Sequence, residues 1–235
     1  MTLIQKELKN AYIGEYKGWH PSSDTIVWYK LETDTKDYSG NNRDATNNWV
    51  TFSDGFWTFS TTNNSSSQWP YIQYDNWLTW WFKTISCWFY KTYSINWMLC
   101  VWDVSRNISN WYIQLRTQNP NWFSIKSSSV WNVDVTNGSY TVQFNKWHLF
   151  TLTQNVANNV SWGWTLKIYL DGNYYGTKSW HIDYRVYIIW SWKESNNSYY
   201  YNFPWKLSNF IIETKEWSAQ DVTDYYNLTK WQYWY

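Results

Sequence analysis

Short runs in which apolar and polar residues alternate recur along this chain of 235 residues. The run TISCWFY shows the pattern most clearly, because Ile85, Cys87 and Phe89 alternate there with Trp88 and Tyr90. Successive side chains of an extended strand lie on opposite faces, so each run predicts a strand with one buried face. Turn signals separate the runs at short intervals. This arrangement predicts an all-β fold, an antiparallel β-sandwich of the jelly-roll type.

Local signals define two further elements. Asp171 and Gly172 stand between two alternating runs and predict a tight hairpin turn. Ser218 precedes the segment AQDVTDYYNLTK, and Asp221 follows it three residues later. A serine with an acidic residue at this spacing is typical of a helix N-terminus, so we expect one short C-terminal helix.

The first 24 residues differ from the rest of the chain. Lysine and glutamate alternate there with apolar residues up to Pro21, so we interpret 1–24 as an N-terminal arm or attachment segment and 25–235 as one domain. The start MTLIQKELKN lacks the apolar core of a signal peptide. No apolar run approaches the ~20 residues of a membrane-spanning helix, so we expect no membrane contact.

The charge of the chain argues against a nucleic-acid-binding protein, and its cysteines leave two interpretations open. The chain carries 19 Lys and Arg against 18 Asp and Glu, a formal net charge of +1. Its basic residues are scattered, and aromatic stacking on nucleic acid also needs a positive groove, so no nucleic-acid partner is expected. Cys87 and Cys100 both fall in strand-like runs, which leaves two interpretations: buried free thiols or a single bridge.

Four stretches resemble, in this order, the LamG-like domains of the concanavalin A-like jelly-roll family. They are DYSGNNRDATNNWVTFSDG, KTISCWFY, KWHLFTLTQN with TLKIYLDGNYYGT, and WKLSNFIIETKEWSAQDVTDYYN. The resemblance covers residues 25–235. It implies a concanavalin A-like sandwich that recognises ligands by loops at one rim or by its concave sheet.

Tryptophan is in excess and glycine in deficit, with 24 Trp and 8 Gly. The resemblance places several Trp where the family has Gly: Trp49, Trp57, Trp80 or Trp81, Trp162, Trp164, Trp190, Trp192, Trp205 and Trp234. One interpretation is that these codons are UGA, natively read as Gly. The other is a real Trp-rich surface that stacks on sugars. A bulky residue held at positive φ costs ~1–3 kcal/mol, which favours recoding wherever these positions are turns.

The resemblance also implies a calcium site between the early Asp-rich loop and the closing strand. Asp37 fits the first position. Ser208 and Asn209 stand where the family has a closing pair of acidic residues, so the site carries less negative charge here. Since Ca²⁺ prefers oxygen ligands, we predict a structural Ca²⁺ held by Asp37 and Asn209; alternatively, both residues cap turns.

No catalytic constellation is apparent. The Glu-x-Asp-x-x-Glu spacing of related glycosidases is absent, and so is Gly-x-Ser-x-Gly. His181 and Asp183 could pair a base with an acid, but no nucleophile lies near them in sequence. His148 occupies a strand position common in the fold and is expected to be structural. The chain is therefore predicted not to be an enzyme.

The stretch from Val101 to Asp134 is the least family-like part of the chain, and it combines Trp with neighbouring Asn. Aromatic rings stack on the C–H faces of sugars, while amides and charged groups bind hydroxyls. The predicted ligand-binding residues are Trp102, Trp111, Trp122, Trp131, Asn110, Asn121 and Arg116. The alternative is that alternate residues form core, with either Trp111 or Tyr112 pointing inward.

These observations favour non-catalytic recognition of a cell-surface or particle-surface glycan. The arm QKELKNAYIGEYKGWHP is similar to segments that begin some phage tail proteins, so the leading hypothesis is a phage or phage-like tail protein. The arm is then a candidate for homo-oligomer contacts, and the location is the virion or the outside of a cell. Alternatives are a bacterial surface adhesin and a structural virion decoration subunit without a ligand.

Overall fold

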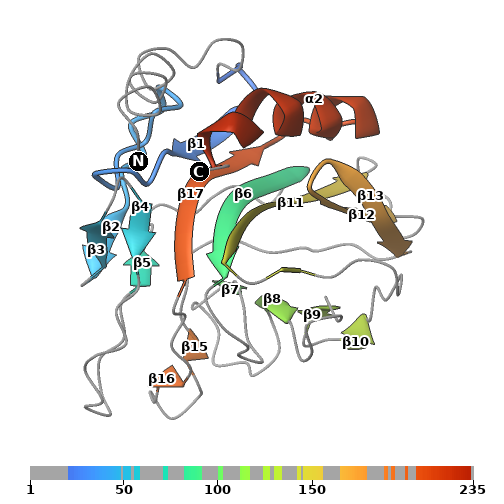
Figure 1. Ribbon diagram of the computed structural model, residues 1–235, viewed down its shortest axis with the longest axis horizontal. Helices are drawn as coiled ribbons and strands as arrows, with labels where there is room; N and C mark the ends of the chain where they lie inside the picture. Colours follow the sequence, from blue (N-terminus) through green and yellow to red (C-terminus); the bar gives the residue numbers. More distant parts are fainter. Residues whose placement is uncertain are drawn as a thin grey trace.

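Antiparallel strands form two facing sheets in the computed structural model of the chain, with one helix outside them (Figure 1). The structure describes residues 21–48, 50–53, 56–58, 71–73, 82–91, 100–102, 112–116, 124–127, 130–133, 142–143, 145–155, 165–178, 188–189, 192–193, 199–200 and 205–233. The all-β antiparallel sandwich with one short C-terminal helix, predicted from the alternating runs, is confirmed.

The larger sheet has eight strands. Seven follow the order β13 (Asn173–Lys178), β12 (Thr165–Leu170), β11 (Lys146–Asn155), β6 (Thr84–Lys91), β17 (Trp205–Glu213), β4 (Phe56–Thr58) and β3 (Thr51–Ser53). The eighth, β1 (Thr25–Tyr29), pairs with β17. Strands from the two ends of the domain therefore lie side by side, which is typical of a jelly roll.

The smaller sheet has seven strands. Their order is β10 (Val130–Val133), β9 (Ser124–Ser127), β8 (Tyr112–Arg116), β7 (Cys100–Trp102), β14 (Ile188–Ile189), β5 (Tyr71–Gln73) and β2 (Thr46–Asn48). A separate two-stranded ribbon joins β15 (Trp192–Lys193) to β16 (Tyr199–Tyr200). Strands β7 to β10 lie on the side of the larger sheet opposite the helix (Figure 1).

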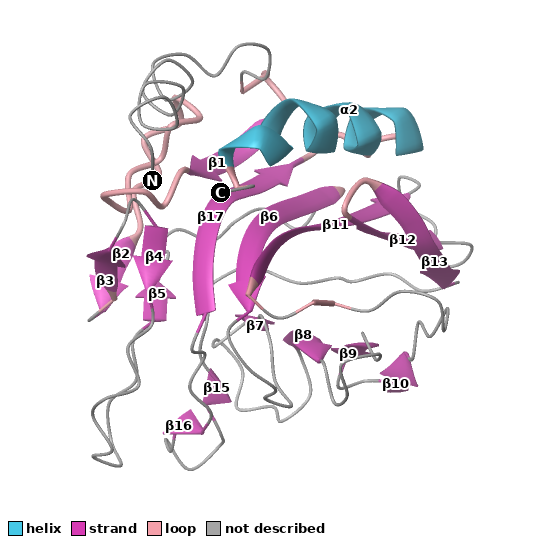
Figure 2. Cartoon of the chain, viewed as in Figure 1, coloured by secondary structure: helices cyan, strands magenta, loops and turns pink. Residues whose placement is uncertain are grey.

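The C-terminal helix is α2 (Ala219–Thr229), followed by the 3-10 turn η1 (Lys230–Gln232). Ser218 is its N-cap: its side chain accepts from the backbone N–H of Asp221, whose carboxylate accepts in return from the Ser218 N–H. The predicted cap is thus confirmed as a capping box. Figure 2 shows α2 lying across the outer face of the larger sheet.

Alternation along β6 divides the buried side chains between two layers. Ile85, Cys87 and Phe89 belong to the core between the sheets, as predicted, while Trp88 faces the helix. The inner core also takes Ile72 from the smaller sheet. The outer cluster joins sheet residues to the helical segment and consists of Trp28, Trp88, Leu149, Tyr169, Ile211, Trp217, Val222, Tyr225 and Tyr233. The larger sheet is therefore buried on both faces.

The hairpin between β12 and β13 turns at Asp171 and Gly172, as predicted. Both residues have positive φ, 50° and 77° respectively, which is the backbone of a type I′ turn. A Cβ on Gly172 would lie 3.0 Å from Tyr226 Cβ, and Thr223 Oγ1 donates to the Gly172 carbonyl at 3.0 Å. Glycine is needed here both for the turn and for the close approach of α2.

Three of the tryptophans aligned with family glycines lie in described strands. Trp57, Trp192 and Trp205 are in β4, β15 and β17 rather than in turns. The argument from strain was made for turns, so it does not apply at these three strand positions. The described non-glycine residues with positive φ are Leu31, Asn42, Asn145, Asp171 and Asn209. The other proposed glycine positions lie outside the described residues.

Cys87 is a buried free thiol, so the first of the two interpretations of the cysteines is confirmed for this residue. Burial raises the pKa of its thiol well above the usual range, because the apolar core disfavours the thiolate. Cys100 lies in β7, where the structure describes the backbone. Cys87 is therefore part of the packing.

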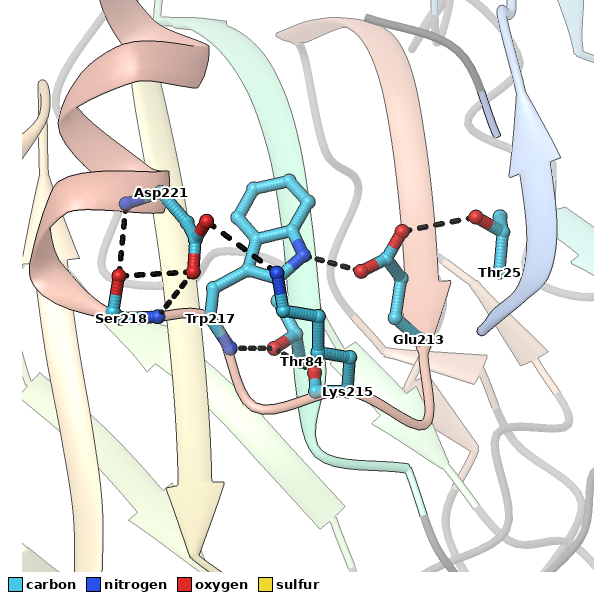
Figure 3. A network of polar contacts seen from close by, with 7 residues as sticks. All are labelled: Thr25, Thr84, Glu213, Lys215, Trp217, Ser218 and Asp221. Atoms are coloured by element: carbon cyan, nitrogen blue, oxygen red, sulfur yellow. Dashed lines mark hydrogen bonds and ion pairs between the residues drawn. The ribbon is translucent and has the colours of Figure 1, made fainter. Parts of the chain in front are cut away.

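A buried carboxylate joins β17 to the segment that leads into α2 (Figure 3). Glu213 is 3% exposed, accepts a hydrogen bond from Thr25 Oγ1 at 2.9 Å and accepts another from Trp217 Nε1. Thr84 Oγ1 accepts from the Trp217 N–H at 3.0 Å and donates to the Lys215 carbonyl at 2.7 Å. Burial raises the pKa of Glu213, and these two donors oppose the shift.

Replacing Glu213 by Gln tests the cost of this buried charge. A carboxyl whose pKa is raised in the folded state binds its proton more tightly there than in the unfolded chain. Its contribution to stability is therefore lost as pH rises from the usual Glu value of 4.5 through the higher folded value. We expect chemical denaturation to show that E213Q loses less stability than the parent chain between acidic and neutral pH.

E213A is the matched control, because it leaves Trp217 Nε1 and Thr25 Oγ1 without their acceptor. It should cost ~1–3 kcal/mol at neutral pH, the usual penalty for an unsatisfied buried polar group. Identical pH dependence in E213Q and the parent chain would contradict the assigned role of burial.

Candidate functional site

The smaller sheet has two faces of different chemistry, which its strand register defines. Ile72 is 0% exposed and belongs to the core between the sheets. Its row continues across neighbouring strands through Ile189, Val101 and Ile113. Leu115 lies two residues beyond Ile113, at a position on the same face of the strand, and pairs with Ile125 of β9. These register positions carry aliphatic residues, except at the edge of the sheet, where Asn47 pairs with Ile72 and is exposed.

The opposite face carries aromatic and polar residues. One row runs from Thr46 and Gln73 through Ile188 to Trp102 and Tyr112. Thr46, at the edge of this row, is exposed. Gln114 pairs with Lys126, and Arg116 pairs with Ser124, in the next rows. We call this face of the smaller sheet the outer row face. It comprises the strand positions in register with Thr46, Gln73, Trp102, Gln114 and Lys126.

Two of the seven predicted ligand-binding residues lie together on the outer row face. Trp102 pairs with Tyr112, and Arg116 lies four residues beyond Tyr112 on the same strand. Trp131 lies in β10, where the register shifts between Val130 and Val133. The remaining four, Trp111, Trp122, Asn110 and Asn121, lie outside the described residues. Tyr112 shares the register row of Trp102, and Trp111 lies outside the described residues, so the choice between ligand-binding and core roles for this stretch stays a prediction.

Asp37 organises the loop between β1 and β2. Its Oδ1 accepts from the N–H of Trp28 at 3.0 Å and of Ser39 at 2.9 Å. Its Oδ2 accepts from Ser39 Oγ at 2.8 Å and from the Arg43 N–H at 3.0 Å. Four donors converge on one carboxylate, so the Asp-x-Ser-Gly motif folds this loop as a closed turn.

Asn209 lies in a bulge of β17, where the pairing with β6 shifts between Ser208 and Ile211. It has φ of 49°, a conformation that asparagine tolerates better than most residues. Its Oδ1 accepts from Trp28 Nε1 at 3.1 Å, and its Nδ2 donates to Tyr233 Oη. Tyr233 Oη donates in turn to Ser208 Oγ at 2.8 Å. The amide thus joins β1, β17 and the chain after α2.

The two predicted calcium ligands therefore both contact Trp28, Asp37 at its backbone and Asn209 at its indole. The Asp37 side chain makes hydrogen bonds within its loop, whereas the Asn209 side chain joins β1 to the chain after α2. No group of three His, Cys, Asp or Glu residues that could hold a metal ion occurs within the part of the chain that the structure describes. Calcium binding by Asp37 and Asn209 stays a prediction.

His148 has a structural environment, as expected. Its Nδ1 lies 2.7 Å from Asp171 Oδ2, and Asp171 Oδ1 accepts from the Leu149 N–H at 2.8 Å. The Gln143 N–H donates to His148 Nε2 at 3.1 Å. Both side chains are buried, so this pair fixes the hairpin turn against β11 and presents no reactive atom to solvent.

One cluster at the surface, in which Tyr38 is the exposed member and Trp28 is buried, was not predicted from the sequence. Lys30 Nζ lies 4.3 Å from the ring centroid of Tyr38 and 5.2 Å from that of Trp28. Tyr38 Oη donates to Asp34 Oδ2 at 3.1 Å, and burial raises the pKa of Tyr38. The only signal in the sequence was the lone tyrosine of the Asp-Tyr-Ser-Gly motif, which gives no hint of its cationic neighbour.

Comparison with solved structures finds this fold in toxin binding domains. The binding domain of botulinum neurotoxin serotype D matches with a TM-score of 0.58 and 19% identity, over 87% of this chain and 51% of that chain. The binding domain of Paraclostridial Mosquitocidal Protein 1 matches with 0.58 and 18%, over 87% and 52%. The binding domain of botulinum neurotoxin DC in complex with SialylT matches with 0.59 and 15%, over 87% and 51%.

At these identities the likeness shows the fold alone, a β-sandwich of the kind used in binding domains. The chain spans about half the length of the matched chains. No protein-family model and no curated protein matches its sequence. The LamG-like assignment and the phage-tail resemblance of the arm stay predictions. Among the described helices, none has the length and apolar character needed to cross a membrane.

Replacing Asn209 tests the buried amide and the bulge separately. N209G keeps the positive φ but removes the partners of Trp28 Nε1 and Tyr233 Oη, so it should lower the free energy of unfolding by ~1–3 kcal/mol. N209A also forces a side chain into the left-handed region, which costs ~1–2 kcal/mol more. The expected order in urea denaturation is parent, N209G, N209A. Equal stability of all three would contradict the assignment.

Proposed function

We propose that this chain is a non-catalytic glycan-binding domain, and that it belongs to a phage or phage-like tail protein. The observation that carries the proposal is the pairing of Trp102 with Tyr112 on the face of the smaller sheet opposite Ile72. Aromatic residues in a row across a sheet suit the extended apolar faces of linked sugars. The amides of Gln73 and Gln114 occupy the same face and are suited to sugar hydroxyls.

The fold likeness supports the binding part of the proposal. One matched structure is of a neurotoxin whose cell entry is described as dependent on two ganglioside molecules, and another is a complex with SialylT. A further one is a complex with rat synaptotagmin II. Each of these statements belongs to the toxin. For this chain they support extracellular recognition, and the arm's resemblance supports the tail-protein context.

Trp102→Ala is the variant that tests the proposed ligand face. An aromatic residue at the centre of a binding surface contributes about 2 kcal/mol or more, so binding on a glycan array should fall by more than tenfold. Trp231→Ala is the matched control, because Trp231 is 52% exposed on the helix side of the molecule. It should bind glycans like the parent chain.

Three results would contradict the proposal. Equal loss of binding in both variants would mean that Trp102 has no special role. Release of reducing sugar from a bound glycan would show that the domain is an enzyme. Absence of glycan binding, together with a stable oligomer in solution, would favour the structural decoration subunit.

We infer further that part of the tryptophan excess comes from UGA codons that the source reads as glycine. The imbalance of 24 Trp against 8 Gly supports this, whereas the strand positions of Trp57, Trp192 and Trp205 remove the argument from strain. The gene should carry UGA at these three codons and UGG at the family-typical Trp88, Trp111 and Trp147. UGG at every position would contradict recoding.

A further inference from the structure

Two cationic residues share the outer row face with Trp102 and Tyr112. Lys126 of β9 pairs with Gln114 of β8, and Arg116 lies two residues beyond Gln114 on the same strand. Residues two apart on a strand share a face, so Arg116 and Lys126 occupy diagonal positions on neighbouring strands. Such diagonal positions are typically ~7–8 Å apart, close enough for one extended ligand to reach both.

No acidic residue accompanies them at the described positions of this face. Those positions are Thr46, Asn48, Tyr71, Gln73, Cys100, Trp102, Tyr112, Gln114, Arg116, Ser124, Lys126 and Ile188. The whole chain is almost balanced, with 19 basic and 18 acidic residues. At its described positions the outer row face therefore carries positive charge alone, whereas the chain as a whole is almost neutral.

The chemistry of the two cations differs from that of a neutral sugar site. Neutral sugars need amides, hydroxyls and aromatic rings, which this face already has in Gln73, Gln114 and Trp102. Arginine presents a planar fork of donors that matches a carboxylate, and lysine adds a point charge. Two cations beside an aromatic row suit a chain of sugars that carries carboxylates at regular intervals.

We propose that the glycan bound by the outer row face is acidic, with carboxylate-bearing sugars held by Arg116 and Lys126 beside Trp102. This inference rests on the proposed function, because it names the ligand class of the same face. It goes further because it requires recognition to depend on the charge of the glycan as well as on its sugar backbone.

The test compares matched probes that differ in charge. The probes are oligogalacturonate and its carboxyl-reduced form, and sialyllactose and lactose. A neutral glycan array and a single-stranded oligonucleotide complete the set. Binding to the full-length chain is measured by biolayer interferometry at low and high salt. At least one acidic member should bind at least tenfold more tightly than its neutral partner, and salt should weaken that binding.

Variants assign the effect to the two cations. R116Q/K126Q should lower the affinity for the acidic probe by about tenfold or more, the usual effect of losing a charge-assisted hydrogen bond. The control K167Q/K215Q removes the same charge from the helix side, where these lysines pair with Glu216 and Asp221. It should bind like the parent chain. Circular dichroism checks that each variant is folded.

The outcomes separate the inference from the proposed function. Binding of neutral glycans that W102A abolishes and R116Q/K126Q leaves unchanged would overturn the acidic ligand while leaving a glycan-binding domain. Equal binding of the oligonucleotide would overturn glycan selectivity and point to a general polyanion site. Equal losses in both double variants would show that only net charge matters. No binding to any glycan would overturn both proposals.

Discussion

Burial of the outer face of the eight-stranded sheet is the constraint on which the rest of the structure depends. Trp88 stacks there against Tyr233 at 4.3 Å and Tyr226 at 5.7 Å between ring centroids, beneath helix α2. A sheet that is apolar on both faces needs a third layer, and the C-terminal helix provides it. The described faces of the larger sheet are thus taken up by packing, and the proposed ligand face is the outer row face of the smaller sheet.

Buried polar groups determine how that third layer docks. Trp88 Nε1 donates to Thr229 Oγ1 at 3.0 Å, and Asn209 joins Trp28 to Tyr233. Burial raises the pKa of Tyr233, so its hydroxyl remains a protonated donor at ordinary pH. Each of these contacts would leave an unsatisfied group if the helix shifted along the sheet. The apolar cluster therefore supplies the affinity of the helix for the sheet, and the polar contacts select one position for it.

Local patterns predicted the elements well, because their physics is local. The parity of β6, the Asp171–Gly172 turn and the Ser218 cap all depend on neighbours within a few residues. The bulge at Asn209 was missed, since an asparagine in an alternating run resembles any exposed strand position. Trp102 and Arg116 were predicted as ligand residues from the sequence, but the register that places them in line with Lys126 depends on pairing between separate strands. The strain argument does not apply at Trp57, Trp192 and Trp205, which lie in strands, because the family comparison reports residue identity and not backbone conformation.

The proposed ligand face lies on the side of the smaller sheet away from the helix. Amide chemical-shift mapping by NMR tests it most directly, with isotope-labelled chain titrated with oligogalacturonate and with sialyllactose. The account predicts that the largest shifts fall in β7, β8 and β9, at residues 100–102, 112–116 and 124–127, while 219–233 stay unchanged. Shifts confined to α2 and β17, or no shifts with either probe, would contradict it.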